Sequence, residues 1–289
     1  GSDDSHGRAL WALGMILGRS TTPALHDMAG RVFQQSLLAI LETSSPRAWA
    51  FALIGIHEYL KRFAGDRRVS QVQEELAGRL LSLYKDNQRE GWNWFEDKLT
   101  YCNASLSHAM LLCGESIPNP EMTNIGLESL GWLADIQRSD TEGKHFVPIG
   151  SNGFYPRGGE RARFDQQPVE AQAMVSTCLE AYRITGKKIW QMEARRAFEW
   201  FLGRNDLHLP VYDPTTGGCR DGLHPDRVNE NQGAESTLAF LQSLLELRLA
   251  ENIEESHEHS HNEQSPIKSI STPHVEPHPD SRKLALSSQ

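Results

Sequence analysis

The sequence predicts an all-α fold, and three features of its pattern indicate this class. Nine segments of the 289-residue chain repeat apolar residues with helical spacing rather than with the alternation of a β-strand. Strand-like alternation is limited to short pieces such as 146–149. Apolar, alanine-rich segments alternate along the chain with amphipathic, highly charged ones. Together these features favour a domain built from packed layers of helices.

Capping residues and helix breakers mark the boundaries of these segments. Asp4 or Ser5 can cap the first helix, and Ser45 followed by Pro46 has the residue types that begin the third. Pro168 occupies the same kind of position in the seventh helix. The predicted helices cover 4–18, 24–42, 46–63, 68–85, 101–114, 120–138, 167–185, 188–204 and 233–250.

The alternation of helix types predicts two concentric layers. Helices that are apolar nearly all round must be buried, and the amphipathic helices can supply the layer that covers them. The pattern is a repeat of helical hairpins with a period of about 45 to 60 residues. If the inner helices are parallel, the long loops that precede them open at one end, where functional groups gather. The predicted inner helices are 4–18, 46–63, 101–114, 167–185 and 233–250.

Composition narrows the possible partners and the compartment. The net charge of −9 argues against nucleic acid as the main partner. The chain has no apolar run long enough to span a membrane. Its four cysteines form no C-x-x-C pair, so we expect reduced thiols, a cytoplasmic location and no metal or other cofactor.

The last part of the chain differs from the rest in composition. Residues 251–289 have almost no aliphatic clusters and several prolines, which is typical of disorder. We therefore expect a folded domain over 1–250 and a disordered tail, rich in His, Pro and Ser, over 251–289. Alternating histidines at 257, 259 and 261 could bind a metal weakly, but in a flexible acidic tail they are more often solvated.

Seven runs carry a resemblance to a known family: DDSHGRALWALG, SPRAWAFALIG, WNWFEDKLTYCNASLSHAMLL, GGERARFDQQPVEAQAMV, FEWFLGRNDL, YDPTTGGCRDGLHPD and NQGAESTLAFL. They resemble a bacterial family of (α/α)6 toroids in the six-hairpin glycosidase-like group, found alone or fused to retaining glycosyltransferases of the GT-B type. The resemblance implies a carbohydrate ligand and a possible glycosyltransferase partner or fused domain. It also implies twelve helices, so the expected fold is a toroid-like double ring that lacks its first three helices.

Acidic residues gather just before the predicted inner helices. Cleavage of a glycosidic bond needs a general acid and a base or nucleophile, typically two carboxylates. The stretch 157–170 is the most site-like, because many charges precede a helix that looks buried. The candidates are Asp3, Asp4, Glu96, Asp97, Glu160, Asp165, Glu170, Asp221, Glu230 and Glu235. Of these we predict that Asp97, Asp165, Glu170 and Glu235 line one polar cavity as catalytic residues, and that at least one has a raised pKa.

Each acid also has a purely structural interpretation. Asp4 and Glu235 can be helix caps or first-turn acids, and Asp97 or Glu160 can pair with Arg161 or Arg163. The predicted tryptophans can equally be core residues, and His108 on an apolar helix face is more often a core histidine than a base. With these alternatives open, the predicted substrate-binding residues are Trp92, Trp94, Tyr155, Arg163, Gln167, His224 and Asn231.

Three functions remain open on this pattern. The first is a glycoside hydrolase-like enzyme that uses two carboxylates. The second is a non-catalytic glycan-binding or scaffold domain that accompanies a glycosyltransferase. The third is a sugar epimerase, which would need two histidines facing one cavity, and only His224 with His6 or His108 is placed for that.

Overall fold

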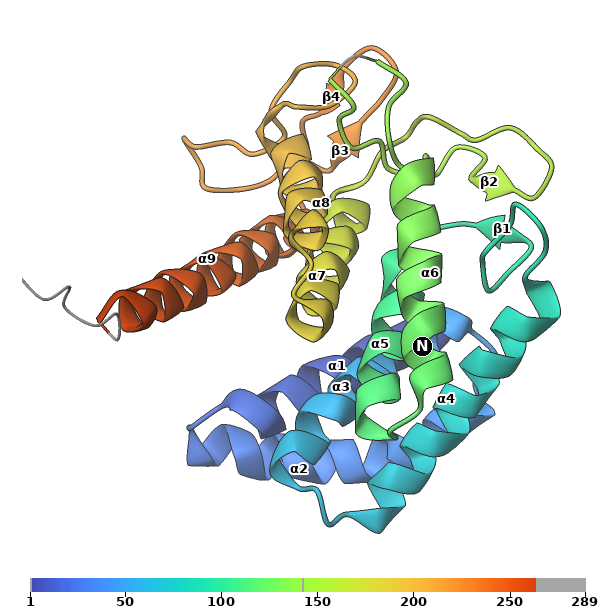
Figure 1. Ribbon diagram of the computed structural model, residues 1–289, viewed down its shortest axis with the longest axis vertical. Helices are drawn as coiled ribbons and strands as arrows, with labels where there is room; N and C mark the ends of the chain where they lie inside the picture. Colours follow the sequence, from blue (N-terminus) through green and yellow to red (C-terminus); the bar gives the residue numbers. More distant parts are fainter. Residues whose placement is uncertain (1, 142, 264–289) are drawn as a thin grey trace, which may run out of the picture. The chain divides into compact units, whose positions relative to one another are not determined.

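The computed structural model describes residues 2–141 and 143–263, and helices dominate them, as the sequence predicted (Figure 1). By its contacts the chain divides into two units, Gly1–Ala250 and Glu251–Gln289, and the description below concerns the first. Of the tail predicted to be disordered over 251–289, residues 264–289 lie outside the described residues. The helices in the described part are α1 (Asp3–Arg19), α2 (Pro23–Ser36), α3 (Pro46–Arg62), α4 (Arg67–Asn87), α5 (Ala104–Ser116), α6 (Pro120–Ile136), α7 (Pro168–Thr185), α8 (Lys188–Glu199) and α9 (Ala234–Glu263).

Two predicted helices are shorter than expected and end in 3₁₀ turns. The segment 24–42 is divided into α2 and the 3₁₀ helix η1 (Leu37–Glu42), and α8 is followed by η2 (Trp200–Leu202). In a 3₁₀ helix residues three apart lie on one face, which lets Leu37 and Ile40 both be fully buried. The predicted α9 ended at 250, whereas the helix continues to Glu263.

The caps agree with the prediction in two places out of three. Ser45 caps α3 by accepting a hydrogen bond from the backbone N–H of Ala48 at 3.3 Å. Pro168 lies in the first turn of α7. The cap of α1 is Ser2 rather than Asp4 or Ser5. Asp4 lies inside the first turn instead, where its carboxylate is bonded to side chains of other elements.

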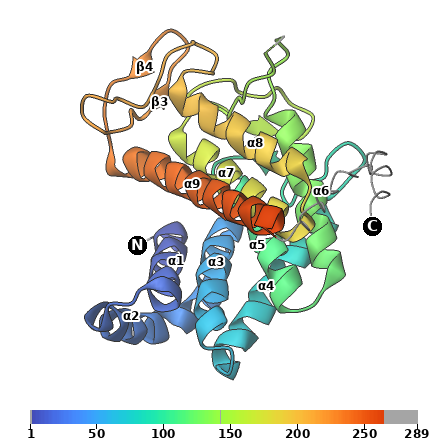
Figure 2. The same cartoon turned by 60° about the vertical axis from the view of Figure 1, so that its left-hand side comes forward.

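The inner and outer layers are distinguished by burial. In α3 every residue from Ala50 to Tyr59 is buried, whereas in α2 only Ala29 and Phe33 are buried. This confirms the prediction that 46–63 is an inner helix and 24–42 an outer one. The inner helices α1, α3, α5 and α7 pack against one another in sequence order, and each packs against the outer helix that follows it (Figure 2).

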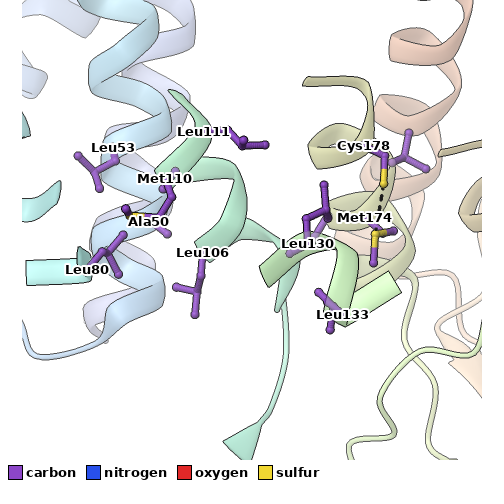
Figure 3. Close-up of a cluster of buried hydrophobic side chains, with 14 of the residues drawn as sticks. Ala50, Leu53, Leu80, Leu106, Met110, Leu111, Leu130, Leu133, Met174 and Cys178 are labelled. Atoms are coloured by element: carbon purple, nitrogen blue, oxygen red, sulfur yellow. Dashed lines mark hydrogen bonds between the residues drawn. The ribbon is translucent and has the colours of Figure 1, made fainter. Parts of the chain in front are cut away.

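The core between the layers is formed by aliphatic side chains and sulfur atoms. Leu53 of α3 and Leu80 of α4 lie on one side of α5, while Leu130 and Leu133 of α6 lie on its other side, toward α7 (Figure 3). On α7, the Sγ atom of Cys178 is 3.4 Å from the Sδ atom of Met174. All four cysteines are buried free thiols.

Glycines bring α1 and α3 unusually close together. A Cβ atom added at Gly14 would lie 2.1 Å from the carbonyl oxygen of Gly55, and one added at Gly55 would lie 2.4 Å from the carbonyl oxygen of Leu10. Only glycine permits backbones to approach this closely. The contact sets α1 directly beside α3, so that side chains at both ends of α1 reach those of α3.

Two small sheets hold the long loops near the starts of the inner helices (Figure 1). The strand β1 (Lys98–Leu99) pairs antiparallel with β2 (Tyr155–Pro156). The strand β3 (Gly222–Leu223) pairs antiparallel with β4 (Val228–Asn229). A further bridge joins Leu223 to Gln166, two residues before α7. The loops before α5, α7 and α9 are therefore tied to one another by backbone hydrogen bonds.

Candidate functional site

One group of side chains connects the N-terminal parts of all five inner helices, and we call it the mouth cluster. Its members contact one another through hydrogen bonds, ion pairs and ring contacts that are described below. Six of them are buried, four are partly buried and Glu235 is exposed, and they come from segments up to about 230 positions apart in the sequence. The mouth cluster consists of Asp4, Arg8 and Trp11 of α1, Arg47 and Phe51 of α3, Tyr101, Cys102 and Asn103 before α5, Val169 and Glu170 of α7, and Glu235 of α9.

The floor of the mouth cluster is aromatic. Phe51, Cys102 and Val169 form a small buried apolar group that is separate from the main core. Trp11 and Tyr101 are partly buried against this group, and the rings of Trp11 and Phe51 are nearly parallel, with centroids 5.8 Å apart. Burial raises the pKa of the Cys102 thiol to about 12, so this cysteine is a neutral packing residue. Half-exposed aromatic faces beside polar groups are what small-molecule sites commonly present.

Glu170 is the buried carboxyl group of the cluster, with only 2% of its surface exposed. Its Oε2 atom accepts hydrogen bonds from Asn103 Nδ2 at 2.9 Å and Gln137 Nε2 at 3.3 Å. Its Oε1 atom is buried and has no hydrogen-bond partner among the described residues. Burial raises the pKa of Glu170 to about 7, although the Asn103 hydrogen bond and the charge of Arg47 act in the opposite direction. Glu170 is therefore mostly protonated below about pH 7 and mostly ionised above it.

Asn103 positions Glu170 and the turn that leads into α5. Its Oδ1 atom accepts from the backbone N–H of Thr100 at 2.9 Å and from Arg47 Nη2 at 3.2 Å. Its Nδ2 atom donates to the Thr100 carbonyl as well as to Glu170. The side chain is fully buried and bonded at both of its ends. A change at this position would therefore displace the Glu170 carboxyl group.

Asp4 is the second carboxylate that faces the same turn. Its Oδ2 atom accepts a hydrogen bond from the Tyr101 hydroxyl at 2.6 Å, and its Oδ1 atom accepts one from Ser45 Oγ at 3.0 Å. Burial and the hydrogen bond to Asp4 raise the pKa of Tyr101, which keeps the phenol protonated and donating. Asp4 and Glu170 thus contact the same turn, Asp4 at Tyr101 and Glu170 at Asn103.

Two arginines of the cluster are used very differently. Arg47 is 3% exposed and donates to the Tyr101 carbonyl at 2.5 Å, to Glu96 at 2.7 Å and to Asn103. Arg8 has a side chain that is 31% exposed, and its guanidinium carbon lies 4.5 Å above the centre of the Phe51 ring. Arg47 is a structural tie, while Arg8 faces partly into solvent.

The structure pairs two of the predicted site residues in a second location. His224 donates from Nδ1 to Asp165 Oδ1 at 2.6 Å, and both side chains are partly exposed. The Gln166–Leu223 bridge brings the two loops together and so explains the pair. Asp165 is not in contact with any member of the mouth cluster among the described hydrogen bonds and ion pairs.

Arg163, Gln167 and Asn231 lie in three different surroundings. Arg163 makes a two-point ion pair with Asp206, at 2.8 Å from each of two nitrogens, which ties the loop before α7 to the loop after α8. Gln167 is the residue that precedes the first turn of α7, and its side chain makes no capping hydrogen bond. Asn231 is exposed in the loop before α9.

The predicted role of the aromatic residues of 92–94 is not supported by their burial. Trp92 is 4% exposed and Trp94 is fully buried, because both rings pack on Trp132. Tyr155 packs edge-on against Trp92 at 5.4 Å. These rings stabilise the loop around β1 and β2, and the two tryptophan rings are buried. The core interpretation left open for the tryptophans describes them better than sugar stacking does.

The predicted common cavity of four acids is likewise not what the structure shows. Glu170 and Glu235 belong to the mouth cluster, Asp165 pairs with His224, and Asp97 is an exposed residue before β1. The neighbouring Glu96, not Asp97, is directed to the inner helices, where it pairs with Arg47. The four acids differ in burial and in bonding partners. These depend on tertiary contacts, which the positions of the acids in the sequence do not reveal.

Sequence reasoning missed Arg8, Trp11, Arg47 and Tyr101 as site residues. It searched the loops, whereas Arg8 and Trp11 lie one to two turns inside α1. A usable signal was present, because Asp4, Arg8 and Trp11 follow the spacing of one helix face. Where polar and aromatic residues share one face of an otherwise apolar inner helix, that face is a candidate site.

Two other features, a metal site and a membrane-spanning helix, were not found among the described residues. These residues contain no group of three or more His, Cys, Asp or Glu side chains arranged to hold a metal ion. None of the helices in the described part of the chain is both long and apolar enough to cross a membrane.

Comparison with known proteins finds similarity in fold rather than in sequence. No protein-family model and no curated protein matches this chain. An unsaturated glucuronyl hydrolase specific for heparin aligns with a TM-score of 0.60 and 14% identity, over 85% of this chain and 66% of its own length. A glycoside hydrolase family 76 mannosidase from Bacteroides thetaiotaomicron aligns with a TM-score of 0.55 and 10% identity, over 86% of this chain and 71% of its own.

These two neighbours are (α/α)6-toroid glycosidases, and at such identities the likeness shows the fold. This chain therefore has the helical-hairpin architecture of an (α/α)6 toroid, as the sequence predicted. The mouth cluster lies at the N-terminal ends of the inner helices of that architecture.

Proposed function

We propose that this domain is a glycoside hydrolase-like toroid that acts on a carbohydrate at the mouth cluster. The observation that carries the proposal is the buried Glu170, whose pKa is raised to about 7, on the turn 101–103 that Asp4 also contacts, next to the apolar group of Phe51, Cys102 and Val169. A glycosidase needs one carboxyl group that keeps its proton and a second that acts as base or nucleophile. The two structural neighbours, a glucuronyl hydrolase and a mannosidase, support a carbohydrate as the substrate class.

In this proposal Glu170 is the general acid and Asp4 is the second carboxylate. Glu170 donates its proton to the oxygen of the leaving group, while Asp4 acts at the anomeric carbon directly or through a water molecule. Because Glu170 is only 2% exposed, contact between Glu170 and the glycan requires neighbouring side chains to rearrange. Trp11 and Tyr101 supply the rings on which a sugar face stacks.

The test is hydrolysis of a panel of oligosaccharides with product detection, using the wild type and Glu170→Gln. Loss of a positioned general acid lowers the rate by about 10²- to 10⁴-fold. The activity of the wild type should fall as the pH rises through about 7, because the acid must carry its proton. Glu121→Gln is a matched control, since Glu121 is an exposed acid on α6 that pairs only with Lys85.

A second arm of the same test uses Asp165→Asn. The sequence named Asp165 among four catalytic acids, and its pairing with His224 makes it a specific alternative to Glu170. If Asp165→Asn abolishes turnover and Glu170→Gln does not, the catalytic centre is the Asp165–His224 pair and our assignment is wrong. If both variants and the wild type show equal turnover, neither acid is catalytic.

The second candidate function is glycan binding without catalysis, in a domain that accompanies a bacterial glycosyltransferase. It is favoured because two acids in contact with arginines of the cluster are paired: Glu96 pairs with Arg47, and Glu235 lies 3.9 Å from Arg8. The resemblance of the sequence motifs to toroids found beside GT-B-type glycosyltransferases supports such a partner. Binding of oligosaccharides with no turnover at any pH would favour this function over hydrolysis.

A further inference from the structure

The guanidinium group of Arg8 has unused hydrogen-bonding capacity. Arginine carries five N–H donors. Within the part of the chain that the structure describes, Arg8 makes one hydrogen bond, from Nη2 to the Sγ atom of Cys102 at 3.3 Å, and sulfur is a weak acceptor. Arg47, the second residue of α3, instead donates to three oxygen acceptors. Arg8 is thus the arginine of the mouth cluster that can take a ligand.

The orientation of Arg8 is fixed although its donors are not used. The guanidinium group stacks on Phe51, with 4.5 Å between its carbon and the ring centre, and Phe51 is itself 1% exposed. Stacking on an aromatic face holds the plane of the group and leaves its edge for planar, two-point binding of an anion. A half-exposed, pre-oriented guanidinium group is the usual means of recognising a carboxylate, sulfate or phosphate.

Glu235 lies where such an anion would bind. Its Oε2 atom is 3.9 Å from Arg8 Nη2, at the limit of an ion pair, and its side chain is 64% exposed. An exposed pair of this kind contributes little to stability, so the carboxylate can leave at small cost. Glu235 therefore compensates the charge of Arg8 when no ligand is present, which differs from the catalytic role that the sequence suggested.

From these contacts we infer that the glycan of this site carries an anionic group, which binds Arg8 and displaces Glu235. The inference rests on the proposed function and specifies its substrate class as an acidic glycan. Arg8 is then a specificity-determining residue. The shared chemistry is a planar or tetrahedral oxyanion, and its source is either the carboxylate of a uronic acid or a sulfate or phosphate ester.

The experiment measures binding by calorimetry to three matched sets of tetrasaccharides. The first set contains uronic acids, the second contains the same oligosaccharides after reduction of their carboxyl groups, and the third contains neutral sugars bearing sulfate esters. The wild type should prefer an acidic set over its neutral counterpart, and the preference should weaken as salt is added. The first and third sets distinguish a carboxylate from an ester.

Two variants should move the affinity in opposite directions. Arg8→Gln removes a charge-assisted, two-point contact and should weaken acidic binding by about tenfold to a hundredfold, leaving the neutral set unchanged. Glu235→Gln removes the competing carboxylate and should strengthen acidic binding by about two- to fivefold. Because Glu235 is exposed, this variant does not depend on the stability of the fold. Arg31→Gln is the control, since Arg31 is an exposed arginine on α2 that pairs only with Asp27.

Each other outcome overturns the inference. If the wild type binds or cleaves neutral glycans as well as acidic ones, the proposed function stands and the acidic substrate class is wrong. If Arg8→Gln loses neutral and acidic binding equally, Arg8 is structural. If Glu235→Gln leaves acidic binding unchanged or weakens it, Glu235 does not compete for Arg8. If no glycan binds at all, both the inference and the proposed function fail.

Discussion

Two carboxyl groups at opposite ends of the inner helices have opposite pKa shifts. Glu170 lies in the first turn of α7, at the mouth, and its pKa is raised to about 7. Glu58 lies near the end of α3, and its pKa is lowered to about 2. Burial is the largest single influence on both groups and raises both pKa values. What differs is the set of partners, because Arg19 and Lys61 contact Glu58 at 2.7 and 2.8 Å, whereas Glu170 is bonded to amides.

The comparison also shows that the helix dipole does not decide these pKa values. A carboxylate is favoured at the N-terminus of a helix and disfavoured at the C-terminus by about 0.3 to 1 kcal/mol. Glu170 is at the favourable end and yet its pKa is raised, and Glu58 is at the unfavourable end and yet its pKa is lowered. Direct cationic partners and desolvation therefore outweigh the dipole. At the same end as Glu58, burial also lowers the pKa of His57 and of His108, the latter to about 4.

We expect the largest effect on stability from a change that separates α1 from α3, because it disturbs the contacts at both ends of these two helices. Gly55→Ala places a Cβ atom 2.4 Å from the Leu10 carbonyl oxygen, and backbone must move to relieve the contact. Overpacking of this kind costs about 3 kcal/mol or more of unfolding free energy. Chemical denaturation measures it, and Gly78→Ala on α4, whose added Cβ meets nothing within 4 Å, should stabilise by up to about 1 kcal/mol. Equal stability of the two variants would show that α1 and α3 are not in close contact.

We expect a smaller effect from a change confined to the C-terminal end of α3, where Glu58 lies. Glu58→Gln should lower the unfolding free energy by about 2 kcal/mol at pH 7, a value reduced because both cationic partners are more than half exposed. The pKa of Glu58 is depressed on folding, so its contribution is present above about 4.5 and is lost as the pH falls toward 2. Denaturation curves of the wild type and the variant should therefore converge in acid. A constant difference from pH 7 to pH 2 would mean that the carboxylate charge is not the source.

The smallest effect should come from Lys61→Gln. The Lys61 side chain is 53% exposed and makes one contact with Glu58, while Arg19 makes two. We expect a loss of about 0.5 kcal/mol or less from Lys61→Gln, and a larger loss from Arg19→Gln. If the two losses are equal or reversed, the two-point Arg19 contact is not the main reason for the low pKa of Glu58.

Sequence periodicity was sufficient to predict the fold, because the composition of a helix indicates whether it is buried. The all-α class, the nine helices of the described part and the identity of α3 and α7 as inner helices follow from runs of apolar residues and from signals such as Ser45 and Pro168. The break between α2 and η1 did not follow, because the 3₁₀ turn depends on how Leu37 and Ile40 meet the core.

The candidate site was predicted only in part, because its partners come from different helices. Glu170 was named from its place at the start of a buried helix. Nothing local to Glu170 indicates that it bonds Asn103, or that Asp165, five residues earlier in the preceding loop, pairs with His224. Trp92 and Trp94 sit beside acids in the sequence, yet Trp132, far along the chain, covers them. Long-range contacts of this kind decide which polar residues take part in the candidate site.

The most direct test of the central claim is the titration of the Glu170 carboxyl group, followed by ¹³C NMR of protein labelled in its glutamate side chains. Comparison with Glu170→Gln assigns its resonance. The account predicts a signal that is absent from the variant and titrates with a pKa near 7, well above the pKa of Glu58. A Glu170 signal that titrates near 4.5, the value of an ordinary glutamate, would contradict the claim that this site holds a proton at neutral pH.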